Sequence, residues 1–260
     1  MGVLNVTPDS FSDGGRYLAV DAAVAHGLAL AEAGADIVDV GGESTRPGSQ
    51  RISPGEEEAR VLPVIAQLAE AGVRVSIDTL NASTALSAAA AGASVVNDVS
   101  GGLADPGMLP QIAGTPLTYI VGHWRGPMSD GGDTRYGDVV AEVRAELQER
   151  VRDAKAAGIA AGQLVIDPGL GFGKAGESNW RLLARFAELR ELGLPVMVGA
   201  SRKRFIGALL PEGAPLRDRD FPTAVLSVLA AQAGAWAVRV HDVAATRLAL
   251  DVLERWEDAR

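Results

Sequence analysis

The sequence predicts an α/β fold, a (β/α)8 TIM barrel that forms a single domain over residues 1–260. Short apolar runs alternate with longer runs rich in Ala, Leu, Glu and Arg from one end of the chain to the other. Eight such pairs leave about 30 residues for each unit, which is the size of one strand and helix of a barrel. No internal repeat or linker divides the 260 residues into smaller domains.

The eight apolar runs are the predicted strands. They are apolar on both faces, as expected of strands that are covered on each side. They comprise residues 2–6, 37–40, 74–77, 94–97, 117–121, 164–166, 196–198 and 237–240. An open, doubly wound sheet is the alternative architecture, because hydrophobic periodicity does not show whether a sheet closes.

The segments between the strands carry helical patterns. Val139, Val143, Leu147 and Val151 recur every fourth residue and predict a helix with one buried face. The last helix is expected to bury a stripe made of Thr246, Ala249, Leu250, Leu253 and Trp256. Glycines follow several Ala- and Leu-rich stretches, where helix C-termini favour this residue: Gly34, Gly72, Gly92, Gly158 and Gly193.

Composition excludes several classes of function. With 24 Lys and Arg against 33 Asp and Glu, the net charge of −9 argues against a broad nucleic-acid or acidic-membrane surface. The absence of cysteine excludes thiolate catalysis, Cys-ligated zinc, iron–sulfur clusters and disulfides, and it is compatible with a cytoplasmic location. Three stretches, at 80–97, 107–124 and 221–238, contain no Asp, Glu, Lys or Arg. Each includes Pro, Asn, Gln, Ser or Gly, so we expect no membrane span. We also expect no signal peptide, because residues 1–4 lead directly into Asn5.

Polar side chains follow every predicted strand, at the end where a barrel places its chemistry. Taken singly, each could be a turn residue or a helix cap. Eight polar clusters at eight strand ends instead indicate one convergent pocket. The residues at these ends include Asn5, Arg46, Asp78, Asn97, His123, Asp167, Lys203, Arg239 and His241.

The polar residues divide into two chemical sets. Asp78, Asn97, Asp167 and Lys203 suit a flat heterocycle with amide-like and guanidine-like edges, because a carboxylate accepts two parallel N–H bonds. Asn5, Arg46, Arg239 and His241 suit an anion such as diphosphate. A hard divalent cation, by default Mg²⁺, would bridge phosphate oxygens to an amide or carboxylate oxygen.

Several sequence blocks occur in order over nearly the whole chain: Asn-Val-Thr-Pro-Asp-Ser-Phe-Ser-Asp-Gly-Gly at 5–15, Gly-Gly-Glu-Ser-Thr-Arg-Pro-Gly at 41–48, Ser-Ile-Asp-Thr at 76–79, Asn-Asp-Val-Ser-Gly at 97–101, residues 167–174, Ser-Arg-Lys at 201–203 and Arg-Val-His-Asp at 239–242. Together these blocks resemble the dihydropteroate synthase family of folate biosynthesis.

The resemblance implies a transferase that joins p-aminobenzoate to 6-hydroxymethyl-7,8-dihydropterin diphosphate, giving 7,8-dihydropteroate and diphosphate. It implies that Asp78, Asn97, Asp167 and Lys203 bind the pterin and that Asn5, Arg46, Arg239 and His241 bind the diphosphate. Asn5, with Asp13, is then the expected Mg²⁺ site. The expected p-aminobenzoate site comprises Phe11, Thr45, Pro47, Phe172, Lys203 and Arg204. Lys203, Arg239, His241 and Asp167 are the expected catalytic residues.

The resemblance also implies a homodimer formed through the later helices and a target for sulfonamides, which mimic p-aminobenzoate. Gly122 departs from the family, which commonly has methionine before this histidine, and the glycine is expected to leave space. His123 is expected either to contact substrate or to pack behind the residues that do.

Three other functions remain as alternatives. The first is a pterin-binding module without synthase activity, such as the methyltetrahydrofolate-binding barrel of corrinoid-dependent methyltransferases, which would not need the blocks at 201–203 and 239–242 for a diphosphate. The second is an inactive paralogue, which normally has lost residues in these blocks. The third is a phosphate-binding barrel lyase or isomerase, which would leave the block at 5–15 without a function.

Overall fold

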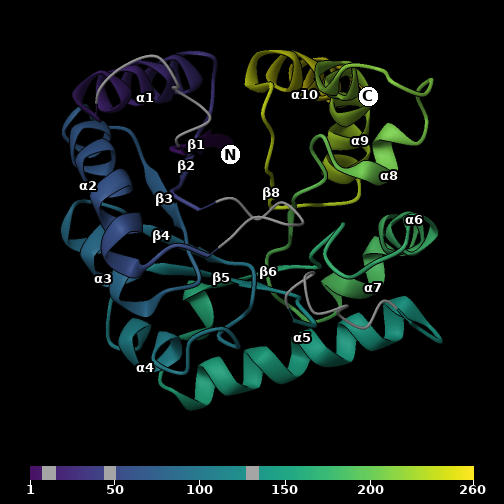
Figure 1. Cartoon of the computed structure of the whole chain (residues 1–260). Coiled ribbons are helices and arrows are strands. Elements are labelled where there is room, and N and C mark those ends of the chain that lie inside the picture. Colours follow the sequence, from purple (N-terminus) through teal and green to yellow (C-terminus); the bar gives the residue numbers. More distant parts are fainter. Residues whose placement is uncertain (8–15, 44–50, 127–134) are drawn as a thin grey trace.

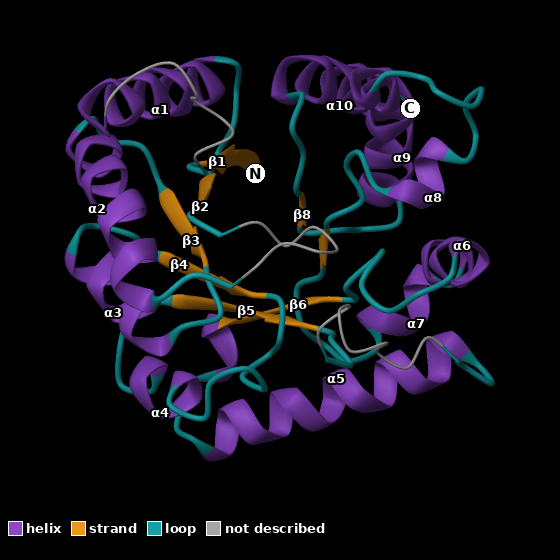
Figure 2. Ribbon diagram, viewed as in Figure 1, coloured by secondary structure: helices purple, strands orange, loops and turns teal. Residues whose placement is uncertain are grey.

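A computed structural model of the chain describes residues 1–7, 16–43, 51–126 and 135–260. It contains eight parallel strands surrounded by helices (Figures 1 and 2). The strands are β1 (Gly2–Asn5), β2 (Val38–Gly41), β3 (Val75–Asp78), β4 (Val95–Asp98), β5 (Thr118–Gly122), β6 (Leu164–Asp167), β7 (Met197–Val198) and β8 (Ala237–Val238). Each lies within one residue of a predicted strand at its start.

The strands close into a barrel. Strands β1 to β6 pair in sequence order, and β7 pairs with β8. Two isolated parallel bridges join these sheets: Ile166 to Val196 next to β7, and Gly2 to Val240 beyond the end of β8. The barrel prediction is therefore confirmed and the open sheet is wrong, because the last strand returns to pair with the first.

Helices form the outer layer of the barrel (Figure 2). They are α1 (Arg16–Glu32), α2 (Pro54–Glu70), α3 (Ala82–Ala90), α4 (Met108–Ile112), α5 (Val139–Ala156), α6 (Gly176–Ala184), α7 (Phe186–Arg190), α8 (Arg204–Gly207), α9 (Asp220–Gln232) and α10 (Val243–Asp258), with 3-10 helices η3 (Ala161–Gln163) and η4 (Leu216–Arg219). Side-chain caps start three of them: Ser53 for α2, Asp138 for α5 and Asp242 for α10. The five predicted helix-ending glycines all have positive φ.

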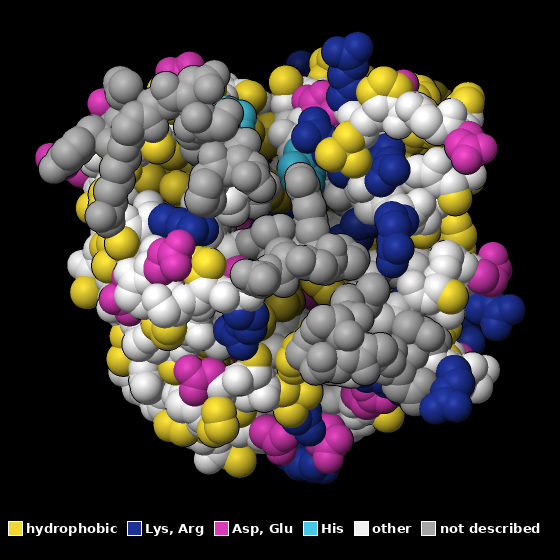
Figure 3. Space-filling view, viewed as in Figure 1, with side chains coloured by type: hydrophobic (Ala, Val, Ile, Leu, Met, Phe, Trp, Pro, Cys, Tyr) yellow, Lys and Arg dark blue, Asp and Glu magenta, His cyan; other side chains and the backbone are white. Residues whose placement is uncertain are grey.

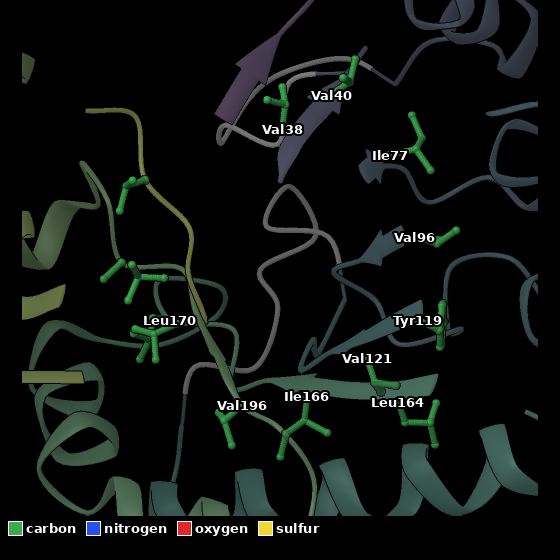
Figure 4. Close-up of a cluster of buried hydrophobic side chains, with 14 of the residues drawn as sticks. Val38, Val40, Ile77, Val96, Tyr119, Val121, Leu164, Ile166, Leu170 and Val196 are labelled. Atoms are coloured by element: carbon green, nitrogen blue, oxygen red, sulfur yellow. The ribbon is translucent and has the colours of Figure 1, made fainter. Parts of the chain in front are cut away.

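The outward faces of the strands pack against the helices. Figure 4 shows part of this cluster, with Val38, Val40, Ile77, Tyr119 and Ile166 pointing away from the barrel interior. Burial of such side chains contributes about 1.5–3 kcal/mol each, so this layer is the main source of stability. Along each strand, these outward-facing residues alternate with residues whose side chains point into the barrel.

The inward side chains form an apolar plug with a polar layer above it. The plug consists of Met1, Ile37, Val95, Ile120, Val165, Met197 and Ala237. Two residues further along the same strands stand Val3, Asp39, Asn97, Gly122, Asp167, Gly199 and Arg239. Because side chains alternate along a strand, the step of two keeps these residues inside the barrel. The plug is therefore the floor of a polar site at the carboxyl ends of the strands.

The expected burial of Trp256 is wrong, because its side chain is 62% exposed, whereas Thr246 and Leu253 are buried. Helix α10 thus faces the barrel with the first part of its stripe and turns its C-terminal aromatic outward. None of the helices that the structure describes has the length and apolar character that a membrane crossing requires.

Candidate active site

The acids and amides predicted to bind the heterocycle meet inside the barrel. Asp78 and Asn97 are paired residues on β3 and β4, and Asp167 ends β6. Burial raises the pKa of Asp78 to about 7, although Arg239 opposes the shift. Burial also raises the pKa of Asp167, against the effect of Lys203. These acceptors are shielded from water. A hydrogen bond from a ligand is stronger in such a low-dielectric environment than in water.

The two carboxylate oxygens of Asp167 have different neighbours. Its Oδ1 accepts a hydrogen bond from the Gly169 backbone N–H at 2.8 Å, within the turn that follows β6. A Cβ atom built on Gly199 would lie 3.6 Å from Oδ2 of Asp167, 3.9 Å from Nζ of Lys203 and 4.0 Å from Cβ of Arg239. Three predicted site residues, one at the end of β6 and two beyond the ends of β7 and β8, therefore converge on the space that Gly199 leaves open.

Lys203 lies between β7 and α8, directly before α8, and is held by the loop after β6. Its ammonium donates to the carbonyl of Leu170 and stands 4.5 Å from the ring centroid of Phe172. Burial lowers the pKa of Lys203 to about 8, although Asp167 opposes the shift. The structure thus brings together two residues expected at the p-aminobenzoate site, Phe172 and Lys203. Arg204 begins α8, and its side chain is exposed.

Arg239 joins the two predicted sets. Its Nε donates to Oδ2 of Asp39 at 2.6 Å, and one terminal nitrogen donates to Oδ2 of Asp78 at 2.7 Å. Burial alone would lower the pKa of Arg239, but Asp39 and Asp78 outweigh it and raise the pKa above its usual value. This cation therefore stays charged beside the acids of the heterocycle set.

Asn5 and His241 are the other described residues of the predicted anion set. Asn5 ends β1 opposite Gly41, and a Cβ atom on Gly41 would lie 3.9 Å from Oδ1 of Asn5 and 3.8 Å from Oδ2 of Asp78. His241 follows β8, and its Nδ1 is 3.0 Å from Oγ of Ser201. A surface pocket of about 240 Å³ opens beside His241 and is also lined by His26 and Arg202. On the face shown in Figure 3, Lys and Arg side chains are more frequent over α8 to α10 than over α1 to α3.

Five predicted site residues lie outside the described residues: Phe11, Asp13, Thr45, Arg46 and Pro47. The others that the structure describes, apart from the exposed Arg204, surround the barrel mouth. Their roles stay predictions, and their arrangement is what the single-pocket interpretation requires.

His123 packs behind the site. Its Nε2 is 2.9 Å from Glu146 on α5, and its Nδ1 is 2.9 Å from Nζ of Lys174. Burial lowers the pKa of His123 to about 4 and that of Lys174 to about 7. Lys174 also donates to the carbonyls of Gly169 and Phe172 at 2.9 and 3.0 Å. This buried group holds the loop that carries Phe172.

Sequence reasoning did not select Asp39, Ser201 or Lys174 as site residues. The sequence did contain an indication that Asp39 is important, because an acid inside an otherwise apolar strand needs a partner. Ser201 stands in the Ser-Arg-Lys block, but its contact with His241 spans 40 residues and could not be read from the sequence. Arg202, between Ser201 and Lys203, has φ of +57° and pairs with Asp220 through two 2.7 Å bonds, which fixes the turn that presents Lys203.

The expectation that Gly122 leaves space is wrong, because not even a Cβ atom fits at this position. A Cβ atom here would lie 2.5 Å from the backbone of Val99, so the β4–α4 loop already fills the position. We expect Gly122→Ala to lower the free energy of unfolding by about 1–3 kcal/mol through overpacking, as measured by urea denaturation.

The matched control is Gly55→Ala in α2, where a Cβ atom meets nothing within 4 Å. Its free energy of unfolding should not fall. Equal stability of the Gly122→Ala protein and the unsubstituted protein would contradict the close approach of Val99.

Asn5 is the one predicted metal ligand that the structure describes. The amide oxygen of Asn5 is a hard donor at the rim of the anion side, and Mg²⁺ commonly takes one or two protein oxygens together with substrate phosphates. Within the described ranges there is no group of three or more His, Asp or Glu side chains that could hold a metal without substrate. The donor set therefore fits a metal that arrives with a diphosphate.

The chain is similar to known proteins over almost its whole length. A model of the family described as "Pterin binding enzyme" matches residues 1–241. The chain is 54% identical over 262 residues to dihydropteroate synthase of Mycobacterium leprae, covering 98% of this chain and 92% of the relative. A structure of Xanthomonas albilineans dihydropteroate synthase with 4-aminobenzoic acid is 46% identical and superposes with a TM-score of 0.91, covering 100% of this chain and 92% of the other. The same enzyme in complex with 7,8-dihydropteroate gives 45%, a TM-score of 0.88, and coverage of 99% and 92%.

Proposed function

We propose that this chain, which belongs to the dihydropteroate synthases of the pterin-binding enzyme family, joins p-aminobenzoate to 6-hydroxymethyl-7,8-dihydropterin diphosphate. The observation that carries the proposal is the convergence of Asp167, Lys203 and Arg239 around Gly199, next to Asp78 and Asn97. Acceptors for a flat ring and cations for its leaving group then share one barrel mouth, and the whole chain acts as a single domain.

The pterin ring is proposed to bind between the acids and Lys203. Oδ2 of Asp167 would accept from the amino-pyrimidinone edge, and Asn97 and Asp78 would take other polar atoms of the ring. Lys203 would donate to a ring carbonyl or nitrogen. Because these residues come from β3, β4, β6 and the β7 loop, the barrel holds the ring from several sides.

The diphosphate is proposed to bind on the side of Asn5, Arg46, Arg239 and His241. Arg239 and His241 would stabilise the negative charge that develops as the diphosphate leaves. We also propose that Asn5, with Asp13, holds a Mg²⁺ ion. When bound, the ion would neutralise charge on the diphosphate oxygens.

The proposed reaction breaks the carbon–oxygen bond between the pterin methylene and diphosphate before the new bond is complete. The electron pair leaves with the diphosphate oxygen, and the electron-rich ring carries the positive charge. The amine nitrogen of p-aminobenzoate then attacks the methylene, and the proton that it releases passes to water or to the departing diphosphate. The protein needs no strong base, because an aromatic amine is neutral near pH 7, so its residues mainly orient the reactants and exclude water.

The p-aminobenzoate is proposed to lie against Phe172 and Lys203, with Phe11, Thr45, Pro47 and Arg204 as further contacts. The 4.5 Å approach of Lys203 to the Phe172 ring supports this place, because it sets an apolar wall beside a cation that can face a carboxylate. Sulfonamides share the shape and charge of this substrate and should compete with it.

A turnover assay tests the function. The purified protein with p-aminobenzoate, pterin diphosphate and Mg²⁺ should release diphosphate and form dihydropteroate, and a sulfonamide should inhibit competitively with p-aminobenzoate. A pterin-binding barrel of the methyltransferase type would bind the ring and release nothing. No diphosphate release at saturating substrates would refute the proposal.

The alkaline pH dependence should reflect Lys203. Its pKa of about 8 means that the ammonium donor is present below pH 8 and lost above it, in the field of Asp167, Arg239 and Asp78. We expect kcat/KM for the pterin diphosphate to fall about tenfold for each pH unit above about 8. Steady-state rates measured across pH 6 to 10 test this.

In the Lys203→Arg protein, the alkaline decline of kcat/KM for the pterin diphosphate should move beyond about pH 10, because arginine stays charged. A profile of the unsubstituted protein that stays flat to about pH 9.5 would show that Lys203 does not control this step.

A homodimer through α9 and α10 is also proposed. These packed helices expose two apolar stripes, made of Phe221, Val225 and Leu229 on α9 and Leu248, Val252 and Trp256 on α10. Exposed apolar side chains that adjoin in this way are typical of an interface. A second copy of the chain is the occupant that the family resemblance implies.

Leu248→Glu should convert the dimer to a monomer in sedimentation velocity, because it places a charge in the apolar contact. Leu86→Glu is the control, since Leu86 is 37% exposed on α3, on the opposite side of the barrel (Figure 1). If the unsubstituted protein sediments as a monomer, these helices do not dimerise.

The proposal includes a cytoplasmic location. A diphosphate ester carries too much charge to cross a membrane unaided, so the enzyme is expected where this substrate is made.

A further inference from the structure

Asp39 occupies the centre of the barrel but has no role in the proposed binding of either substrate. It projects inward from β2, and its side chain is fully buried (0% exposed). Its Oδ2 accepts from Nε of Arg239 at 2.6 Å and from Nδ2 of Asn97 at 3.0 Å. One oxygen atom therefore contacts both the proposed diphosphate set and the proposed pterin set.

Asp39 determines how the Arg239 guanidinium is turned. With Nε bound to Asp39 and one terminal nitrogen bound to Asp78, the planar fork is held at two points. The remaining terminal nitrogen makes no hydrogen bond to any residue that the structure describes. That nitrogen is left to donate to an anion.

Asp39 also determines which atom of Asn97 is available. A carboxylate can only accept, so the Asn97 amide must turn its NH₂ group toward Asp39. Its Oδ1 is then buried with no partner among the described residues. An unpaired buried acceptor costs about 1–3 kcal/mol, and a ring N–H would remove this cost.

We propose that Asp39 is a positioning residue that prepares both halves of the site together, holding Arg239 for the leaving diphosphate and presenting Oδ1 of Asn97 to the pterin. The inference rests on the proposed reaction. The inference extends that reaction by assigning the orientation of both sets to one side chain, to which the proposed function gives no substrate contact.

Asp39→Asn tests the proposal, because it keeps the side-chain size but removes the charge and can offer NH₂ to either neighbour. We expect kcat to fall at least tenfold and KM for the pterin diphosphate to rise at least fivefold. KM for p-aminobenzoate should stay within twofold, and inhibition by inorganic diphosphate should weaken at least fivefold. A purely structural role would lower the melting temperature without this split.

The matched control is Tyr119→Phe, which removes a buried 2.7 Å hydrogen bond to Asp98 on the outer side of the barrel wall. It should lower the melting temperature and leave all kinetic constants within twofold. If Asp39→Asn behaves in the same way as this control, Asp39 positions nothing.

A measurement on the unsubstituted protein covers the case in which Asp39→Asn does not fold. In ¹⁵N-arginine-labelled protein, the Nε–H signal of Arg239, identified by its loss in Arg239→Lys, should exchange slowly with water. Rapid exchange would overturn the proposal. Absence of turnover by the unsubstituted protein would instead refute the reaction, so the two failures can be told apart.

Discussion

Asp167→Asn is expected to lower kcat/KM for the pterin diphosphate about a hundredfold, which corresponds to about 3 kcal/mol. The Gly169 N–H already binds Oδ1 at 2.8 Å, so the new amide will keep its oxygen there. Its NH₂ group then takes the place of Oδ2 and turns a donor toward the donors of the ring. Steady-state kinetics with the pterin diphosphate as the varied substrate measure the loss.

Asp138→Asn is the control for this substitution. Asp138 caps α5 at the surface through its contacts with Val140 and Ala141, and asparagine caps a helix equally well. Its kcat/KM should equal that of the unsubstituted protein. If kcat/KM of the Asp167→Asn protein stayed within about twofold, under 1 kcal/mol, Asp167 would not anchor the pterin.

Arg239→Lys is expected to lower kcat about a hundredfold while KM for p-aminobenzoate stays within twofold. An ammonium on a flexible stem cannot reproduce the 2.6 Å and 2.7 Å bonds to Asp39 and Asp78 and still donate to the diphosphate in a defined direction. Loss of one oriented donor to developing charge costs about 2.7–4 kcal/mol in comparable sites. Initial rates at saturating substrates measure the effect.

Retaining a cation at position 239 keeps the test specific. A neutral substitution would leave the buried Asp39 and the partly buried Asp78 without their cation and would destabilise the fold by about 3–5 kcal/mol. Arg247→Lys on α10, where Arg247 pairs with Asp251 at the surface, is the control and should leave kcat unchanged. A kcat for Arg239→Lys within threefold of the unsubstituted value would remove Arg239 from the proposed stabilisation of the leaving group.

Much of the site could be predicted because all strands of a parallel barrel run in the same direction, so that their carboxyl ends lie on one face. Asp78, Asn97 and Asp167 each end an apolar run, and in a barrel all such ends open on one face. Their convergence follows from strand order alone. The position of Lys203 near Phe172 also follows, since adjacent strands β6 and β7 carry their loops side by side.

Other features depended on side-chain contacts between distant segments. Gly122 was expected to leave space beside the site, yet the backbone of Val99 occupies that space. Trp256 fitted the apolar stripe of its helix, yet α10 turns it outward. Helical periodicity identifies a face but does not say where along the helix the neighbouring structure ends.

The order of residues along the chain was enough to indicate eight strands and one polar pocket at their carboxyl ends, because the apolar runs, the helical patterns and the polar residues after each run are all local properties of the sequence. The pairing of Arg239 with Asp39 and Asp78, across 200 and 161 residues, was not accessible in this way. Those partners are chosen by closure of the barrel, where the bridge from Val240 to Gly2 brings the last strand beside the first ones. An ion pair depends on distance in space, and closure sets that distance.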